Sequence, residues 1–143
     1  MVASHPELNL WQGRFSPDCR WISFNAINPA EAGASAIYAV PVSGGQWTTI
    51  TDGKWFDDKP RWAPDGRLVY FVSNRTGFIN VWGRRFDPAR GTPVGEPFQV
   101  TRFQSSAQQM VSQSLGMAVT RDRLVLSVAS LSGELWILDN VDR

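Results

Sequence analysis

The sequence has one cysteine, Cys19, and one histidine, His5, among its 143 residues. A single cysteine cannot form a disulfide within the chain. A single histidine beside a terminus, where residues are often loosely held, does not suit a Ser-His-Asp or Cys-His site, because such a site needs the imidazole fixed in a cleft. Gly-x-Ser-x-Gly, phosphate-binding glycine loops and zinc-ligand spacings are also absent. The sequence therefore predicts no catalytic activity, metal or cofactor.

The chain has little net charge and no long apolar run. Its 14 Lys and Arg residues and 13 Asp and Glu residues give a net charge of +1, which does not favour nucleic acid or an anionic membrane as a partner. No apolar run approaches the roughly 20 residues that span a bilayer, and residues 1–6 lack the pattern of a signal peptide. We expect a soluble protein, cytoplasmic or periplasmic, with no nucleic-acid or membrane partner.

What the sequence does contain is a repeat rich in aromatic residues, which make up 12% of the chain. Residues 14–24 read Arg-Phe-Ser-Pro-Asp-Cys-Arg-Trp-Ile-Ser-Phe, and residues 61–71 read Arg-Trp-Ala-Pro-Asp-Gly-Arg-Leu-Val-Tyr-Phe. A fainter third copy covers residues 118–126. The shared aspartate recurs after 47 and then 57 residues. Repeats of about 40 to 50 residues built from short strands are typical of β-propeller blades.

Turn residues divide each repeat into strands, because Pro-Asp-Gly and Gly-Gly favour tight reversals between extended segments. The first two repeats open with a short strand ending at Phe15 or Trp62. The further predicted strands are 21–26, 36–42 and 46–51 in the first repeat, 68–73, 79–86 and 98–101 in the second, and 116–119, 124–129 and 134–138 in the third. Residues 87–97 are rich in turn formers and predict a loop. The polar stretch 104–115 is also interpreted as a loop.

The pattern predicts an all-β chain, a partial β-propeller of three blades at about 10–52, 56–102 and 114–143. They form one domain, 1–143, and the third blade lacks its outer strand. Known rings need about four to eight blades, so three would leave apolar flanks exposed. Two copies supply six blades, and a two-fold dimer is the commonest closed assembly. We therefore expect a homodimer, in which residues 1–4 pair with the partner's strand at 134–138.

The second repeat resembles the TolB-type, WD-like β-propeller repeat of bacterial proteins. The family pattern is Pro-x-Trp-Ser-Pro-Asp-Gly, an apolar strand ending in Phe, a Ser-x-Arg-x-Gly loop, and an Ile-Trp or Ile-Tyr strand. The matching residues are Pro60, Trp62, Pro64, Asp65, Gly66, Phe71, Ser73, Arg75, Gly77, Val81 and Trp82. The first repeat departs from the pattern with Cys19 in place of glycine. The resemblance implies the C-terminal blades of a bacterial propeller protein, a binding scaffold with no shared active site.

Aromatic and charged residues gather in loops that are predicted to share one rim of the propeller. Trp55, Phe56, Arg102 and Phe103 follow a fourth strand, and Arg75 follows a second strand. Such side chains on loops are typical of binding surfaces. Alternatively, the aromatic residues pack over the blade tops, and Arg75 ties two blades together through its planar fork of donors. The aromatic residues on strands are expected to be core: Phe15, Phe24, Tyr38, Trp62, Phe71 and Trp82.

These features together predict a non-catalytic interaction module that binds a protein or a small ligand. The alternative is an accessory or sensor propeller domain of a larger hydrolase or signalling protein. The acidic residues Asp52, Asp57 and Asp58 are expected to bond backbone N–H groups rather than a metal ion.

Overall fold

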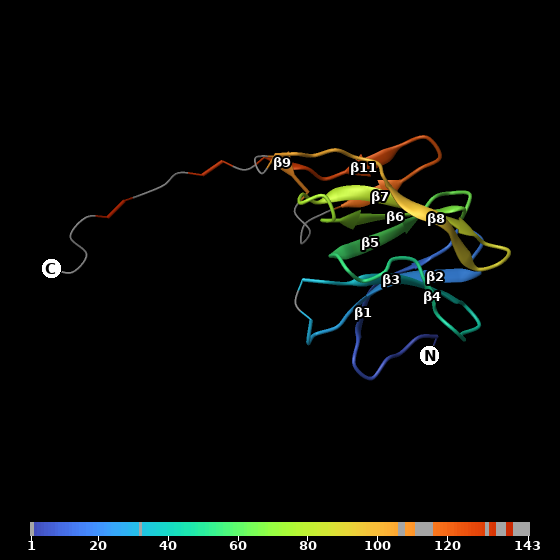
Figure 1. Cartoon of the computed structure of the whole chain (residues 1–143). Helices are drawn as coiled ribbons and strands as arrows, with labels where there is room; N and C mark the ends of the chain where they lie inside the picture. Colours follow the sequence, from blue (N-terminus) through green and yellow to red (C-terminus); the bar gives the residue numbers. More distant parts are fainter. Residues whose placement is uncertain are drawn as a thin grey trace.

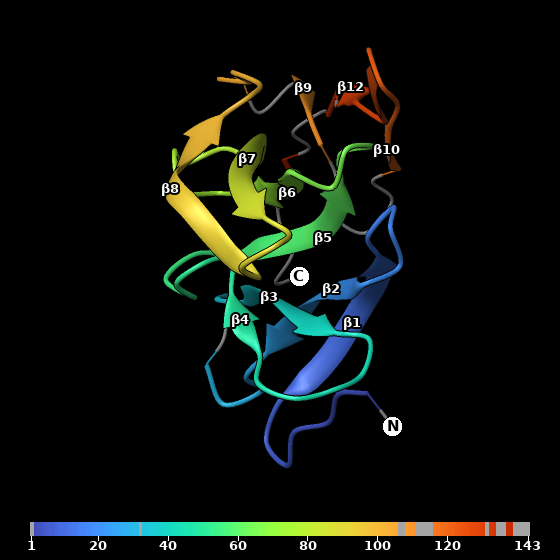
Figure 2. The same cartoon turned by 90° about the vertical axis from the view of Figure 1, so that its right-hand side faces the viewer.

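The computed structural model describes residues 2–31, 33–105, 108–110, 116–130, 132–133 and 137–138. These residues form strands, turns and loops, and none of them lies in a helix, which confirms the all-β prediction. Two four-stranded sheets are stacked, and two short strand pairs lie beyond the second sheet (Figures 1 and 2). Every strand pair is antiparallel.

Each of the two large sheets has its strands in chain order. The first contains β1 (Asn9–Phe15), β2 (Trp21–Ile27), β3 (Ala36–Pro41) and β4 (Thr48–Thr49), and the second contains β5 (Asp57–Trp62), β6 (Leu68–Ser73), β7 (Asn80–Asp87) and β8 (Thr92–Gln99). Four antiparallel strands in this order are the build of a propeller blade. The strands lie close to the predicted positions, except that β4 is shorter than predicted and β8 begins earlier.

The early start of β8 corrects the prediction of a loop at 87–97. Asp87 accepts hydrogen bonds on its side chain from the backbone N–H groups of Ala89 and Arg90, and Gly91 N donates to Asp87 O at 2.8 Å. Gly91 takes a φ of 69°. This tight turn sends the chain straight back along β7. The prolines of β8 fit there because an outer strand leaves one row of N–H positions unpaired.

The third repeat forms two strand pairs instead of one sheet. β10 (Met117–Val119) pairs with β11 (Leu124–Leu126), and β12 (Ala129–Ser130) pairs with β9 (Gln108–Gln109). The loop predicted at 104–115 thus contains a strand, and the strand predicted at 124–129 stops early, where Ser127 N donates to Gly116 O at 3.0 Å.

One predicted strand lies largely outside the described residues. Of the predicted strand 134–138 the structure describes only Ile137 and Leu138, which are exposed. The pairing of this strand with residues 1–4 of a partner and the number of three blades therefore stay predictions.

The repeated turn has the same geometry in both large sheets. Ser16 N donates to Trp21 O and Ala63 N to Leu68 O, each at 2.8 Å. In both sheets an aspartate side chain caps the turn, since Asp18 accepts from Arg20 N and Asp65 from Arg67 N. Cys19 occupies the left-handed position with a φ of 55°, where the second repeat has Gly66 at 69°. The first repeat therefore holds a side chain in a conformation that costs a non-glycine residue roughly 1–2 kcal/mol.

The main hydrophobic core lies between the two large sheets. It consists of Ile37, Ala39, Ile50, Trp62, Val69, Phe71 and Phe86, with Trp21 and Trp82 packed against it. The rings of Trp21 and Trp62 both meet Phe86 edge-on, at centroid distances of 5.3 and 5.1 Å. A smaller core of Val72, Val81, Met110 and Met117 joins the second sheet to the third repeat. Trp62, Phe71 and Trp82 are thus core where two repeats meet, whereas Phe24 is buried in a separate cluster with Ala26 and Val40, against which Tyr38 packs.

Candidate binding surfaces

Three loops meet at the end of the second sheet where β5 begins and β6 ends. We call residues 52–56, 74–79 and 101–104 the rim. Phe56 N donates to Asn74 Oδ1 at 3.0 Å, which joins the first loop to the second. Asn80 joins the second to the third, because its Nδ2 donates to Phe103 O at 3.1 Å and its Oδ1 accepts from Phe103 N at 2.7 Å. Side-chain amides therefore hold the rim loops together.

Arg75, a predicted binding residue, is engaged inside the second sheet. Its Nη2 lies 2.9 and 3.0 Å from the two carboxylate oxygens of Asp57, which is fully buried at the start of β5. The guanidinium also lies over the rings of Phe71 and Trp82, at 5.3 and 4.9 Å from their centroids. Because Asp57 and Arg75 belong to the same sheet, the pair does not tie two blades together. The guanidinium therefore links the loop that follows β6 to the start of β5, and it is not free to bind a ligand.

The buried Asp57 also connects the rim to the first sheet. Its backbone N–H donates to Ser35 Oγ at 3.0 Å, and its carbonyl accepts from the same hydroxyl at 2.6 Å. Ser35 itself is buried and forms an isolated parallel bridge to Phe56. One aspartate thus anchors the rim to both large sheets.

Trp55 is the exposed aromatic residue of the first rim loop. Its side chain is 43% exposed, while its carbonyl accepts a hydrogen bond from Ser35 N at 2.9 Å. The neighbouring Phe56 is half-buried. A fixed backbone with a free indole is a suitable anchor for a partner, because little conformational entropy is lost when it binds.

Arg102 and Phe103 lie together at the edge of a hollow in the rim. The hollow has a volume of about 470 Å³ and is lined by Thr76, Phe78, Gln99, Arg102, Phe103 and Gln104. Arg102 is exposed and has no ion-pair partner among the described residues. Phe103 is half-buried and packs partly against the smaller core. The hollow offers an aromatic wall, amide groups and one free cation.

The first rim loop carries a charge pair of opposite sign. Asp52 and Lys54 lie 3.3 Å apart and both are well exposed. Desolvation is the largest single influence on the Asp52 carboxyl and raises its pKa, but hydrogen bonds from the Lys54 backbone and ammonium, with the charges of Lys54 and Arg75, outweigh it and lower the pKa below the usual value. Asp52 therefore stays ionised across the neutral range, and the rim presents both signs of charge.

A second surface lies on the side of the first sheet that faces away from the second. Phe15, at the end of β1, is 61% exposed, whereas its repeat counterpart Trp62 is 8% exposed. Trp62 is covered because the first sheet packs against it, and its Nε1 donates to Arg14 O at 3.2 Å. No other sheet among the described residues packs against Phe15 in this way. We call this side the open flank.

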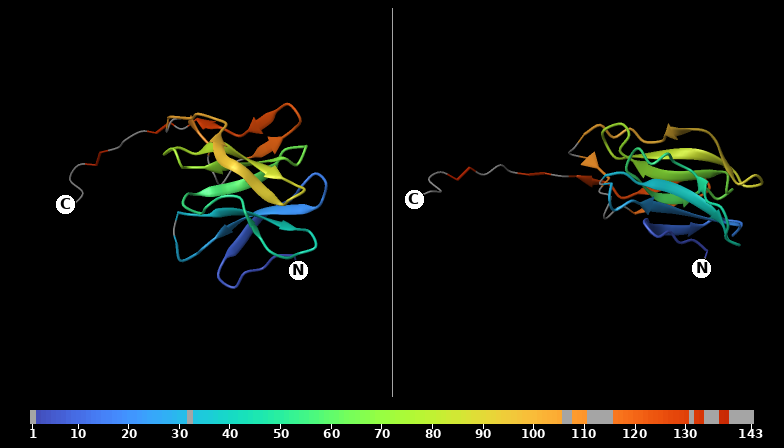
Figure 3. Two further views of the ribbon diagram at one scale, coloured as in Figure 1. Left: turned by 45° about the vertical axis from the view of Figure 1, so that its right-hand side comes forward. Right: turned by 60° about the horizontal axis from the view of Figure 1, so that its bottom comes forward.

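The open flank has its own apolar lining. A groove of about 420 Å³ is lined by Val2, Ala3, Leu10, Trp11, Gln12, Gly13, Ile22, Phe24 and Val40. Trp11 is 58% exposed at its edge. The segment before β1 covers part of the flank, since Ala3 and Leu8 pack against the core of Phe24, Ala26 and Val40 (Figure 3 shows this segment beneath the first sheet). The rest of the flank is open to solvent.

The exposure of Phe15 shows that its assignment to the core was wrong. The repeat pattern correctly placed it on an inner strand, but burial of that position requires a preceding repeat. Sequence reasoning likewise missed Trp11, which belongs to no repeated motif.

The described part of the chain shows neither a metal-binding cluster nor a membrane-spanning helix. There, no group of three or more His, Cys, Asp or Glu side chains is arranged to hold a metal ion. No described segment forms a helix long and apolar enough to span a membrane.

Comparison with known proteins gives partial sequence matches. No family model matches the chain. The uncharacterized protein Atu1656 of Agrobacterium fabrum is 35% identical over 77 residues, which are 54% of this chain and 25% of that protein. The uncharacterized peptidase YuxL of Bacillus subtilis is 33% identical over 66 residues, 46% of this chain and 10% of that protein. The chain thus spans a quarter or less of these relatives.

A solved structure supports the fold over most of the chain. The structure of a candidate TolB from Agrobacterium tumefaciens superposes with a TM-score of 0.60 at 21% identity, and covers 89% of this chain and 47% of that one. At this identity the likeness concerns the fold alone. The chain has a TolB-like β-propeller fold made of antiparallel sheets, as the resemblance of its repeats implied.

Proposed function

We propose that this chain is a non-catalytic β-propeller interaction module, which completes its ring with a second copy of itself and binds its ligand at the rim. The observation that carries the proposal is the contrast between Phe15 and Trp62, equivalent residues of which one is exposed and the other covered by a neighbouring sheet. The open flank thus has the apolar residues that line a junction between two sheets, but no second sheet packs against it.

A second copy is a suitable cover for the open flank. The chain matches 47% of a TolB-like chain in the structural comparison, so two copies approximate the size of one such propeller. An open arc of sheets exposes the apolar flanks of its first and last sheet. Closure into a ring buries these flanks. In the proposed homodimer, the third repeat of each copy covers Trp11 and Phe15 of the other.

Light scattering coupled to size-exclusion chromatography tests the assembly. The wild-type chain is expected to have the mass of a dimer at micromolar concentration, and Phe15→Asp is expected to give a monomer because it places a charge in the apolar contact. The matched control is Val94→Asp, which adds the same charge at an exposed position of β8 and should leave the dimer intact. A monomeric wild type, or a dimer that tolerates Phe15→Asp, would contradict the proposal.

The rim is proposed to bind the partner or ligand, supported by the free indole of Trp55 and the hollow beside Arg102. A photo-crosslinking amino acid at position 104 is expected to capture a discrete partner in cells, and Trp55→Ala with Arg102→Ala is expected to abolish this capture. Both side chains are exposed, so the double variant should melt within a few degrees of the wild type. Unchanged capture by the double variant would place the binding surface elsewhere.

A second candidate function is an accessory or sensor domain of a larger hydrolase. The observation that favours it is the match to the uncharacterized peptidase YuxL, of which this chain covers 10%. In this alternative the repeats gate or orient a catalytic domain. A catalytic domain encoded in the same gene product, with activity altered by changes at the rim, would favour this candidate over a self-contained module.

A further inference from the structure

The two junctions between repeats provide an internal comparison. At the first junction, the indole of Trp21 fills the space beside the repeated turn. Its Nε1 donates to Pro88 O at 3.3 Å, and it lies so close to Gly91 that a Cβ there would fall 2.2 Å from the ring. Trp62 reaches into the same junction from the second sheet. Two tryptophans therefore close the first junction.

Neither tryptophan has an aromatic counterpart at the second junction. The residue equivalent to Trp21 is Leu68, which stands 47 positions later, as the two turns do. The residue equivalent to Trp62 is Val119, because each stands three positions before the aspartate of its turn. The second junction therefore lacks both indole rings, although it gains the ring of Tyr70 where the first repeat has Ser23.

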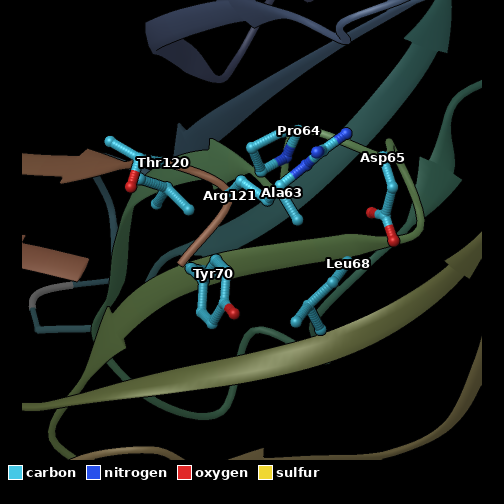
Figure 4. Close-up of a pocket in the computed structure, with 8 residues that line it drawn as sticks. Ala63, Pro64, Asp65, Leu68, Tyr70, Thr120 and Arg121 are labelled. Atoms are coloured by element: carbon cyan, nitrogen blue, oxygen red, sulfur yellow. The ribbon is translucent and has the colours of Figure 1, made fainter. Parts of the chain in front are cut away.

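The missing rings leave a pocket of about 390 Å³, which lies in the range of known small-molecule sites, about 300–1,000 Å³. It is lined by Ala63, Pro64, Asp65, Leu68, Tyr70, Val119, Thr120 and Arg121. Figure 4 shows Leu68 and Tyr70 side by side along β6, Arg121 beside Ala63 and Pro64, and Asp65 at the turn. The pocket lies at the opposite end of β6 from the rim.

The pocket offers one carboxylate and one guanidinium that are not paired with each other. Asp65 uses Oδ1 to accept the backbone N–H of Arg67 at 2.9 Å, which fixes its carboxylate at the turn. Arg121 has no hydrogen bond or ion pair to another described residue, and Asp65 has no ion pair. The hydroxyls of Tyr70 and Thr120 add polar groups to a lining that is otherwise apolar.

We propose that this pocket binds an aromatic α-amino acid in its zwitterionic form. The aromatic ring takes the space that an indole fills at the first junction, against Leu68 and Val119. The ligand carboxylate pairs with Arg121, and its ammonium group pairs with Asp65. This ligand class matches all three features of the pocket, namely a ring-sized apolar space, a free cation and a free anion.

Isothermal titration calorimetry with L-tryptophan tests the chemistry of the ligand. We expect saturable binding, and weaker binding by about tenfold or more for indole-3-propionate, which lacks the ammonium group, and for tryptamine, which lacks the carboxylate. Equal affinity for all three would mean that only the ring is recognised and would overturn the zwitterion assignment.

Variants of the pocket test its location. Asp65→Asn retains the acceptor that caps the turn but removes the charge, and Arg121→Gln removes the guanidinium; each should weaken L-tryptophan by about tenfold or more. The matched control is Asp18→Asn, in the equivalent turn of the first repeat, which should leave the affinity unchanged.

Filling the pocket from within gives an independent readout. Leu68→Trp places an indole at the second junction, where the first junction has Trp21. This variant is expected to abolish L-tryptophan binding while its melting temperature is unchanged or raised. A lowered melting temperature, together with no heat of binding by the wild type, would show that the chain's own side chains occupy the space and would overturn the proposal. Binding that persists in Leu68→Trp would place the ligand elsewhere.

Discussion

Replacing Asp57 by alanine is expected to lower the free energy of unfolding by about 3–5 kcal/mol, because it leaves the guanidinium of Arg75 in a buried site without a counter-charge. Asp57 is fully buried, and the Arg75 side chain is only 14% exposed. The guanidinium cannot turn to solvent without leaving the rings of Phe71 and Trp82. Urea denaturation followed by tryptophan fluorescence measures the loss.

Two further variants separate the buried charge from other effects of the substitution. Asp52→Ala removes the exposed partner of Lys54 and is expected to cost less than about 1 kcal/mol, as surface ion pairs do. Arg75→Met added to Asp57→Ala removes the unpaired charge while keeping an apolar stem, so it should recover much of the lost stability. If the double variant is no more stable than Asp57→Ala, the loss arises from packing and not from the charge.

Trp62→Ala is expected to lower the free energy of unfolding by about 3–5 kcal/mol, the usual cost of removing a buried tryptophan. The indole is 8% exposed, packs edge-on against Phe86, and donates to Arg14 O. Its loss would open a cavity between the two large sheets. Thermal unfolding monitored by circular dichroism measures the effect.

The matched control for Trp62→Ala is Phe15→Ala, the equivalent position of the first repeat. Phe15 is exposed, so its truncation should change the stability of the isolated chain by less than about 1 kcal/mol while weakening the proposed dimer. Equal losses from the two variants under conditions where the chain is monomeric would show that the open flank is covered within the chain.

Much of the fold follows from local patterns. The repeated turn, with proline, aspartate and a left-handed residue, specifies where β1 ends and β2 begins, and the alternation of β6 predicts which of its side chains face each neighbouring sheet. The first part of the strand Thr92–Gln99 was missed because its prolines and glycine were interpreted as loop residues, and only its end overlaps the predicted strand 98–101. The prolines and the glycine are compatible with an outer strand, and only the pairing with β7 reveals that role.

The rim was found from the sequence only in part. Loop aromatics and arginines indicated its position, since Trp55 and Arg102 are exposed there. The pairing of Arg75 with Asp57 was not predicted, because it depends on the two loops meeting at one end of the sheet. The pocket at the second junction was also missed, although the replacement of Trp21 by Leu68 is visible when the repeats are aligned.

The sequence by itself determined the strand class, the repeat and its turns, because hydrophobic alternation and turn residues act over a few positions. Tertiary structure decided which of the repeated side chains are buried. Phe15 and Trp62 have the same local environment along the chain, yet one is exposed and the other is core. The difference arises because burial depends on whether another sheet packs against that face, which no local pattern specifies.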